Sequence, residues 1–514
     1  MPTAASPHRP AGRDPAAARP GDRARVRRLV HADLARLAPG AQRAWWVREA
    51  LAHDPGVPCP PPAGDATADV VVVGGGFTGL WTAWWILDGA PGTRVTVLEA
   101  DIVGGGPSGR NGGFLTGWWD YLPALVRNFG REPGLAAAMA LDGAPAWVGR
   151  WAAAHGVDPW FVPGGTLVVS TSPVQDEAWS GILGLARELG VEDRYRPLTG
   201  DEVRARCDAP LLRGGMLVPS DAQVQPARLA RGLRRVLLER GVTIHEGSRV
   251  TDLREAGAGV RATTDTGAVI RASRAVLAVN AWAAGWPRGG FGARMITWSS
   301  YMVLTEPIPD RIRDLGWTGG EALTDCRFTN HYFRTTADGR IAFGGGGGRA
   351  GYGGRLGRWV TEDRGSVALA ARGFRRLFPM LDDVALTDAW GGPIDIAPNH
   401  LPSFGTLGGG HGAPGRIHWG HGYSGTGVGP SWLGGRILAA LALDRLDDPV
   451  AGLPMVGHRA RRFPPEPFRF LGARVIREAI VANEQRDDDG GFVPPPLRWL
   501  VRLPRAMGYD LGPE

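Results

Sequence analysis

The stretch "VVVVGGGFTGLWTAWWIL", from Val70 to Leu87, contains eighteen residues and no charged side chain. By length and apolarity alone, such a stretch could cross a membrane as a helix. It could equally form a buried strand, a glycine turn and a buried helix. The two possibilities predict different proteins, so the surrounding sequence has to decide between them.

The glycine spacing favours the second possibility. Residues 70–73 are four valines, as expected of a strand that is buried on both faces of a parallel sheet. Gly74, Gly76 and Gly79 then follow the pattern G-x-G-x-x-G, which would be costly inside a membrane helix. In a nucleotide-binding unit, the three glycines permit a tight turn, a close approach of the pyrophosphate and close packing of the helix on the strand.

A carboxylate at the correct distance strengthens this interpretation. The segment "RVTVLEA", residues 94–100, is typical of a second strand and contains Glu99, twenty residues after Gly79. At this position a carboxylate accepts hydrogen bonds from the adenosine ribose. We therefore predict a dinucleotide site rather than a membrane span, with Phe77, Thr78 and Ala100 beside these residues.

Composition limits the kinds of chemistry. The chain has 514 residues, 43% hydrophobic and 21% charged, which is typical of a globular protein with two or three domains. Its net charge is +7, and all 58 basic residues are arginine, so a lysine cannot serve as general base or oxygen-activating cation. Cys59, Cys207 and Cys326 form neither metal spacing nor a disulfide framework. We expect no metal and a cytoplasmic location.

The sequence after Glu99 carries a resemblance to a known family. Residues 100–114, "ADIVGGGPSGRNGGF", resemble the glycine-rich extension that follows the acid in D-amino-acid oxidase-like FAD-dependent oxidoreductases. The part "PSGRNGG", residues 107–113, is most similar to the γ-glutamylputrescine oxidase branch. This resemblance implies FAD as the cofactor. It places these residues along its pyrophosphate: Ser108, Gly109, Arg110, Asn111 and Gly112.

Three later segments resemble the same family in the same order. Residues 221–250 end at Val250, which the resemblance places against the adenine, and residues 271–283 resemble the next strand and turn. Residues 417–443 resemble the last FAD element, in which the first turn of a helix faces the N1/O2 edge of the flavin. The corresponding turn contains Gly422, Tyr423, Ser424, Gly425, Thr426 and Gly427.

The resemblance implies an α/β protein (α+β overall), with a Rossmann-like FAD-binding domain and an inserted mixed-sheet substrate domain. We assign residues 67–120, 221–290 and 389–445 to the first domain and residues 121–220 and 291–388 to the second. Residues 1–66 are predicted to be a disordered basic tail with one short helix within 40–51. Residues 446–514 are predicted to be a helical tail. Its basic, aromatic end packs on protein or, as the less favoured alternative, on a membrane surface, and we expect no nucleic-acid partner.

The substrate side depends on one predicted hairpin, residues 331–345, with its turn at 337–339. The resemblance implies that Arg334 matches the arginine that pairs with the substrate carboxylate in glycine-oxidase-like members. A guanidinium suits this task because it binds a carboxylate through two hydrogen bonds. A structural arginine is the open alternative. Further candidates for the substrate pocket are His331, Tyr332, Tyr301, Trp298 and Tyr423.

The chemistry implied by the resemblance is oxidation of the C–N bond of an amine or amino acid. A hydride passes to flavin N5, the imine is hydrolysed, and O2 is reduced to H2O2. Residues 391–393 are Gly-Gly-Pro where relatives with covalent flavin carry a cysteine, so we expect non-covalent FAD. The missing lysine leaves open a dehydrogenase that reduces a quinone or a protein. An inactive flavin-binding protein with an assembly or regulatory role is a third alternative.

Overall fold

The computed structural model describes residues 20–37, 43–408, 415–488 and 491–509. The opening stretch forms strand β1 (Ala66–Val73), a glycine turn and helix α3 (Phe77–Gly89), followed by β2 (Val95–Leu98). Val70–Val73 pair in parallel with Val95–Leu98. The unit is therefore the predicted strand–turn–helix–strand. Within the described residues, no helix combines the length and apolarity that a membrane span requires.

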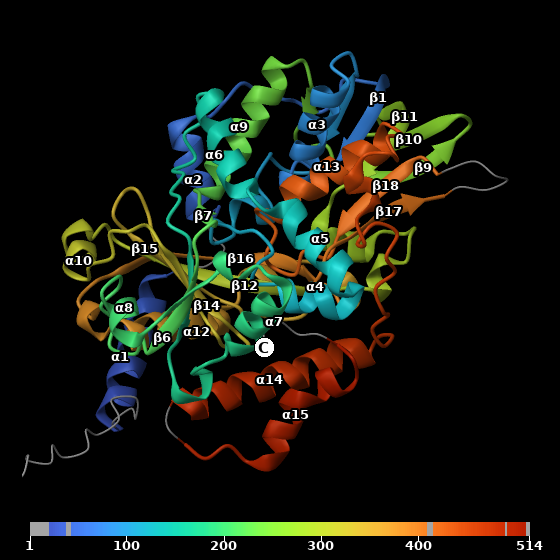
Figure 1. Ribbon diagram of the computed structural model, residues 1–514. Helices are drawn as coiled ribbons and strands as arrows, with labels where there is room; N and C mark the ends of the chain where they lie inside the picture. Colours follow the sequence, from blue (N-terminus) through green and yellow to red (C-terminus); the bar gives the residue numbers. More distant parts are fainter. Residues whose placement is uncertain (1–19, 38–42, 409–414, 489–490, 510–514) are drawn as a thin grey trace, which may run out of the picture.

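The first sheet collects strands from three distant parts of the chain (Figure 1). Its order is β17-β18-β11-β1-β2-β8, with β9 (Val250–Ala256) and β10 (Gly259–Thr264) as an antiparallel extension of β11. β8 (Thr243–His245), β11 (Val269–Leu277) and β18 (Ile417–His421) run parallel to β1 and β2, whereas β17 (Ser403–Leu407) is antiparallel to β18. Helix α3 packs closely against α9 (Pro226–Glu239) and α13 (Pro430–Ala442).

The second sheet has the order β16-β12-β15-β14-β13-β4-β6-β5. It is mixed, because β4 and β13 are parallel while its other neighbouring strands are antiparallel. The strands are β4 (Thr166–Ser170), β5 (Arg196–Leu198), β6 (Gly214–Val218), β12 (Ile296–Thr305), β13 (Ala322–Asp325), β14 (His331–Thr335), β15 (Ile341–Gly345) and β16 (Leu386–Ile396). The predicted hairpin is thus β14–β15. The predicted domain border at residue 389 falls inside β16, which pairs with β12.

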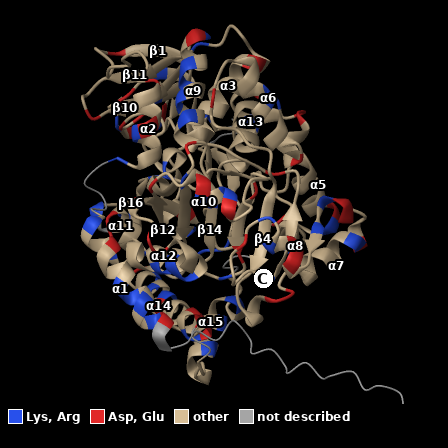
Figure 2. Ribbon diagram, turned by 90° about the vertical axis from the view of Figure 1, so that its left-hand side faces the viewer, with Lys and Arg blue, Asp and Glu red and all other residues tan. Residues whose placement is uncertain are grey.

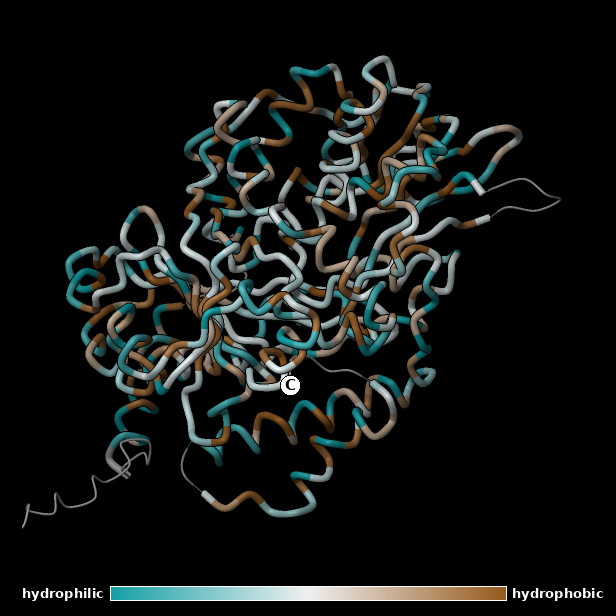
Figure 3. The backbone as a smooth tube through the Cα atoms, in the orientation of Figure 1, coloured by the Kyte–Doolittle hydropathy of each residue, from teal (hydrophilic) through white to brown (hydrophobic). Residues whose placement is uncertain are grey.

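The predicted substrate segment 121–220 contains α4 (Leu122–Phe129), α5 (Arg131–Leu141), α6 (Ala144–Ala154), α7 (Ser180–Leu189) and α8 (Gly200–Arg204). Of these, α5 contacts α13 beside the first sheet, whereas α8 contacts β6 of the second sheet. Trp147 and Trp151 of α6 contact the ring of Trp81 in α3 edge-on, with centroids 5.8 and 5.1 Å apart. The short strands β3 (Phe114–Leu115) and β7 (Ala222–Gln223) pair between the two sheets. Figure 3 shows hydrophobic residues along the strands of both sheets.

The N-terminal prediction needs a correction. Residues 20–36, predicted as part of a disordered tail, form helix α1 (Pro20–Arg36). This helix packs on α12 (Arg364–Leu377), and Asp33 forms an ion pair with Arg375 at 2.8 Å, both side chains being 2% exposed. Its charges therefore have partners in the fold that composition alone does not reveal. Residues 1–19 lie outside the described residues. The short helix predicted for residues 40–51 is observed as α2 (Trp45–His53), which ends two residues later, and residues 40–42 lie outside the described residues.

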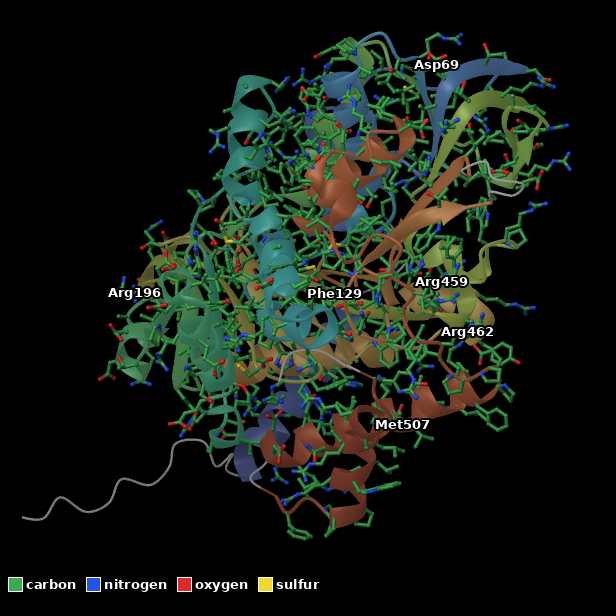
Figure 4. The ribbon with its side chains drawn as sticks, turned by 45° about the vertical axis from the view of Figure 1, so that its right-hand side comes forward. Asp69, Phe129, Arg196, Arg459, Arg462 and Met507 are labelled. Carbon is green, nitrogen blue, oxygen red and sulfur yellow. The ribbon has the colours of Figure 1, made fainter. Side chains whose placement is uncertain are left out.

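The C-terminal segment is helical, as predicted. Helices α14 (Phe468–Asp488) and α15 (Pro495–Ala506) pack on each other at the edge of the molecule (Figure 1). Figure 4 shows Met507 at the end of the molecule opposite Asp69, which lies on β1. The short helix α10 (Pro309–Asp314) follows β12, and the short helix α11 (Arg358–Thr361) packs on β12 and β16 of the second sheet.

Candidate active site

The glycine turn after β1 meets two different requirements. Gly74 has φ +110°, and a Cβ there would lie 2.4 Å from the carbonyl oxygen of Ala278. A Cβ at Gly79 would lie 2.0 Å from the carbonyl oxygen of Gly74. The protein's own packing therefore requires both glycines. At Gly76 a Cβ would meet only Ser108 Oγ, at 3.0 Å, so this glycine keeps the space in front of the helix N-terminus open.

That space belongs to a cavity of about 420 Å³ at the carboxyl ends of β1, β2 and β11. Its size is typical of a small-molecule site, and its place is where open α/β sheets bind ligands. Most of the predicted cofactor residues line it: Gly74, Gly76, Phe77, Thr78, Glu99, Ala100, Ser108, Arg110, Asn111, Val250, Tyr423, Gly425 and Gly427.

The remaining predicted cofactor residues do not line the cavity: Gly79, Gly109, Gly112, Gly422, Ser424 and Thr426. Several of them have a packing role instead. A Cβ at Gly109 would lie 2.1 Å from the carbonyl oxygen of Gly104. Ser424 Oγ accepts a hydrogen bond from the Ala397 N–H at 3.0 Å and donates one to the Gly422 carbonyl oxygen at 3.1 Å. These residues shape the turns that present the lining.

Glu99 is fixed by two backbone donors. The Gly75 N–H donates to its Oε2 at 2.7 Å, and the Asp101 N–H donates to its Oε1 at 2.8 Å. Burial raises the pKa of Glu99. A carboxylate has about four acceptor positions, so this one retains capacity for the hydroxyls of a ribose. The carboxylate is thus held at the end of β2, as the spacing from Gly79 predicts.

Arg110 connects the glycine-rich loop to the second sheet. Its Nε donates to the Gly105 carbonyl oxygen at 2.9 Å, and its Nη1 donates to the Gly391 carbonyl oxygen of β16 at 3.1 Å. In return, Trp390 Nε1 donates to the Arg110 carbonyl oxygen at 2.8 Å. Burial lowers the pKa of Arg110. The loop and β16 therefore form one continuous wall of the cavity.

The sequence analysis missed part of the lining, above all Asp395. Its side chain is fully buried, Oδ1 accepts from Asn280 Nδ2 at 3.0 Å, and Oδ2 accepts from the Gly422 N–H. Burial raises the pKa of Asp395 to about 6. The sequence signal that could have identified it is a carboxylate flanked by Ile394 and Ile396 in a predicted strand. Other missed lining residues are Ser248, Arg249, Ala278, Val279, Asn280, Trp282, Trp286, Leu356, Gly357, Thr361, Pro393, Ile394, Val428 and Ser431.

Arg334 lies on β14, only 2% exposed. Its Nη1 donates to Gln223 Oε1 at 2.9 Å, and its guanidinium lies 5.1 Å from the centre of the Trp46 ring. Nε and Nη2 have no hydrogen-bond partner within the described part of the chain. Burial lowers the pKa of Arg334 to about 9. A Cβ on Gly113 would lie 3.1 Å from Nη2, so the unpaired side of the guanidinium faces the end of the glycine-rich loop.

Among the six substrate-pocket candidates, Tyr423 lines the described cavity, and its hydroxyl accepts from Thr78 Oγ1 at 2.9 Å. Tyr332 lies two residues before Arg334 on the same face of β14, with its hydroxyl 2.7 Å from Ser300 Oγ. A Cβ on Gly344 would lie 2.1 Å from the Tyr332 ring, so this glycine makes room for the ring. The side chains of Tyr332 and Arg334 therefore extend from the hairpin toward the end of the glycine-rich loop.

The other three candidates have structural partners. His331 Nδ1 lies 2.8 Å from Asp325 Oδ2, and Trp298 Nε1 donates to the Gly346 carbonyl oxygen at 3.0 Å. Tyr301 is a correction. It is fully buried in the core of the second sheet, and its hydroxyl donates to the Val360 carbonyl oxygen at 2.7 Å and accepts from the Asp363 N–H at 2.8 Å. It has no surface left to offer a substrate.

With this geometry established, the comparison with known proteins identifies the family. Residues 69–441 match the model of the DAO family, described as FAD dependent oxidoreductase. The protein belongs to this family. It is an FAD-dependent oxidoreductase of the amine or amino-acid oxidase type, and the resemblance predicted from the loop after Glu99 is confirmed.

Individual relatives agree with this assignment. The chain is 29% identical over 407 residues to the probable oxidoreductase OrdL of Rhizobium meliloti, covering 78% of this chain and 88% of that protein. It is 27% identical over 417 residues to the gamma-glutamylputrescine oxidoreductase of Escherichia coli, covering 79% and 91%. The crystal structure of glycine oxidase from Geobacillus kaustophilus shares the fold, with a TM-score of 0.60 at 20% identity, covering 77% of this chain and 100% of that one.

Proposed function

We propose that this protein oxidises the C–N bond of a small amine or amino acid, using non-covalent FAD bound in the cavity described above. The observation that carries the proposal is the composition of that cavity. It joins the glycine turn after β1, the carboxylate of Glu99, the glycine turn before α13 and strand β16 of the second sheet. Nucleotide-binding and substrate-side elements therefore meet in one space.

The residues present fit FAD. The N-terminus of α3, kept open by Gly76, turns its positive dipole end toward the cavity and suits the pyrophosphate, with the Phe77 N–H donating to the Ser108 hydroxyl at 2.8 Å. Glu99 is positioned for the adenosine ribose, and Val250 lines the same cavity on the predicted adenine side. Gly425 and Gly427 precede α13 and expose its N-terminal end. When bound, FAD supplies a two-electron acceptor for a hydride from the substrate.

Non-covalent attachment is supported by the cysteines. Cys59 and Cys207 are buried, Cys326 is partly buried, and none of the three lines the cavity. The wall that relatives with covalent flavin use for attachment is Gly391-Gly392-Pro393 in this chain. A thiol is therefore missing from the wall where a covalent bond to the flavin would form.

We assign recognition of an anionic group on the substrate to Arg334, the open alternative being a structural arginine. Two of its nitrogens lack protein partners while the side chain is almost fully buried. Burying a cation with unused donors is costly, so a carboxylate that accepts from both Nε and Nη2 would relieve that cost. Tyr332, beside it on β14, adds an aromatic wall that would exclude water and favour an ammonium group nearby.

The test uses the purified holoprotein without oxygen. Amines, γ-glutamyl amines, glycine derivatives and D-amino acids are added one by one while the flavin absorbance is recorded. A substrate bleaches the flavin band, and readmission of O2 then restores the band with formation of H2O2. If no member of the panel bleaches the flavin, the proposed function is wrong.

A dehydrogenase that reduces a quinone or a protein is the second candidate, because the chain contains no lysine. The arginines that line the cavity are Arg110 and Arg249, and Arg110 is already engaged by two carbonyl oxygens. The same experiment separates the candidates. A dehydrogenase would be bleached by substrate but reoxidised much faster by a soluble quinone than by O2.

A further inference from the structure

Asp395 is the junction of three chain segments that wall the cavity. Its carboxylate accepts hydrogen bonds from Asn280, which follows β11, and from the Gly422 N–H, which follows β18. Its carbonyl oxygen accepts from the Ser424 N–H at 3.1 Å. The carboxylate therefore holds strand β16 and the two segments after β11 and β18 together at the edge of the cofactor cavity.

The backbone around this junction is strained. Asn280 has φ +47° and Ser424 has φ +52°, a region that residues with a side chain rarely adopt. Both residues are bonded directly to Asp395. Such conformations persist only where the surroundings fix them, and they concentrate at functional sites.

Asp395 also lacks a cationic partner. In the described part of the chain, no arginine or histidine donates a hydrogen bond to it. The ionisable groups on the elements packed around it are Tyr423 and His421 of the β18 end, Arg294 beside His421, and Arg110 on the loop. Burial raises the pKa of Tyr423 and lowers that of His421 to about 3, so both are neutral near pH 7. Arg110 donates to carbonyl oxygens instead.

We propose that Asp395 binds a proton when the FAD in this cavity is reduced and releases it when the FAD is reoxidised. A hydride brings two electrons and one proton to the cofactor, which leaves an extra negative charge in the cavity. A second negative charge, on a buried carboxylate that has hydrogen-bond donors but no cationic partner, is unfavourable in the same low-polarity space. The carboxylate therefore takes one proton from solvent and becomes a neutral acid.

The electrons and protons balance over a cycle. Reduction consumes the two electrons and the proton of the hydride, plus one solvent proton at Asp395. Reoxidation by O2 returns two electrons and two protons as H2O2, one proton coming from the reduced cofactor and one from Asp395. The inference goes beyond the proposed function and needs only FAD binding. The amine substrate does not enter it, and any two-electron reductant will reveal it.

Burial raises the pKa of the Asp395 carboxyl to about 6, and we take this value as the starting point for the oxidised state. Below pH 6 the group is already protonated in both oxidation states, so reduction adds no proton there. Above pH 6 the carboxyl is ionised while FAD is oxidised. Reduction of FAD raises the pKa of Asp395, so the carboxyl stays protonated after reduction until the pH exceeds that higher pKa. Proton uptake therefore begins near pH 6 and extends upward.

The experiment measures the midpoint potential of the holoprotein between pH 5 and pH 9 by anaerobic titration with dithionite and reference dyes. For a two-electron couple, each proton taken up shifts the potential by about 30 mV per pH unit. We expect the wild-type plot above pH 6 to be steeper than that of Asp395→Asn by this amount. Identical slopes in both proteins over the whole range would overturn the proposal.

Two further variants guard against a failure of Asp395→Asn to hold FAD. Asn280→Ala removes a hydrogen bond that favours the ionised carboxylate, so the steep region should begin at higher pH. An unchanged onset in this variant would contradict the proposal. Asp388→Asn, a carboxylate on the same strand that pairs with Arg48 outside the cavity lining, should keep the wild-type slope. Because dithionite replaces the amine, a protein without amine activity still answers this question.

Discussion

The two sheets that meet at the cavity are held in place by different kinds of contact. On the first-sheet side, the decisive contacts are backbone atoms that meet at glycines, as at Gly74 and Gly79. Around the second sheet, the decisive contacts are pairs of buried charged side chains, as Arg327 forms with Asp325 two residues away and with Asp488 much later in the chain. Glycine–backbone contacts require certain positions to have no side chain. Buried ion pairs require particular charged side chains at certain positions.

The hairpin cluster illustrates the second kind. We use this name for Asp325, Arg327, His331, Glu484 and Asp488. Arg327 Nε donates to Asp325 Oδ2 at 2.9 Å and Nη1 donates to Asp488 Oδ2 at 3.0 Å, while the Thr329 N–H donates to Glu484 Oε1 at 3.0 Å. Figure 2 shows charged residues where α12 and α14 approach each other. Helix α14, which lies beyond the residues that match the family, therefore anchors the start of the hairpin that carries Arg334.

The strongest challenge to this contrast is Gly79→Ala. The added Cβ would lie 2.0 Å from a backbone oxygen, which cannot move without opening the glycine turn. We expect a loss of stability of about 3 kcal/mol and a protein that purifies without bound flavin. Flavin absorbance per protein and urea denaturation measure both effects. Gly92→Ala is the control, because a Cβ at Gly92 meets nothing within 4 Å. A Gly79→Ala protein with full flavin content would show that backbone packing is not what decides the first side.

On the opposite side the corresponding change is Arg327→Met. It leaves Asp325, which is fully buried, with His331 as its remaining ion-pair partner, and it removes a partner from Asp488. Breaking a buried ion pair by removing one member costs about 3–5 kcal/mol of unfolding free energy, although the gain from the methionine side chain places our expectation at the lower end. Arg94→Met, in an exposed pair with Asp69, should leave the urea midpoint nearly unchanged. Equal losses of stability in both variants would show that burial of the ion pair around Arg327 does not add to its stabilising effect.

The same contrast explains what could be predicted from the sequence. The glycine turn, Glu99 and the strand–turn–helix–strand unit were predictable, because backbone geometry forces particular residues at fixed spacing. The β14–β15 hairpin was predictable from its turn. The core position of Tyr301, the pairing of Arg334 with Gln223 and the role of Asp395 were not, because each depends on partners more than 50 residues away or on which face of a strand points inward. Helix α1 was missed for the same reason.

Arg334→Gln tests the assigned substrate side. If Nε and Nη2 hold a carboxylate, the substitution removes charge-assisted hydrogen bonds worth about 1.5–3 kcal/mol, which lowers kcat/KM about 10- to 100-fold for substrates that carry a carboxylate. Amines without one should be affected much less. Steady-state kinetics on matched pairs of substrates, with and without the carboxylate, measure the difference. A uniform loss for both kinds, with reduced stability, would make Arg334 a structural residue.

The smallest expected effect concerns a side chain on the first-sheet side, where the contrast predicts that side chains matter least. His421 is 2% exposed, stacks on Trp419 with ring centroids 4.8 Å apart, and neither of its ring nitrogens has a hydrogen-bond partner in the described part of the protein. His421→Phe keeps an aromatic ring in this position. At pH 7.5 we therefore expect little change in the free energy of unfolding.

Acid makes the difference visible. Burial lowers the pKa of His421 to about 3, against 6.5 in the unfolded chain, so the unfolded state binds a proton as pH falls below 6.5 while the folded state does not. The wild type then loses about 2 kcal/mol of stability between pH 7.5 and pH 5 through this residue, and His421→Phe does not. Urea denaturation at the two pH values measures the gap, with exposed His53→Phe as the control. A gap that stays constant with pH would mean that the buried imidazole is protonated in the folded protein, and that a side chain on this side has a charged partner after all.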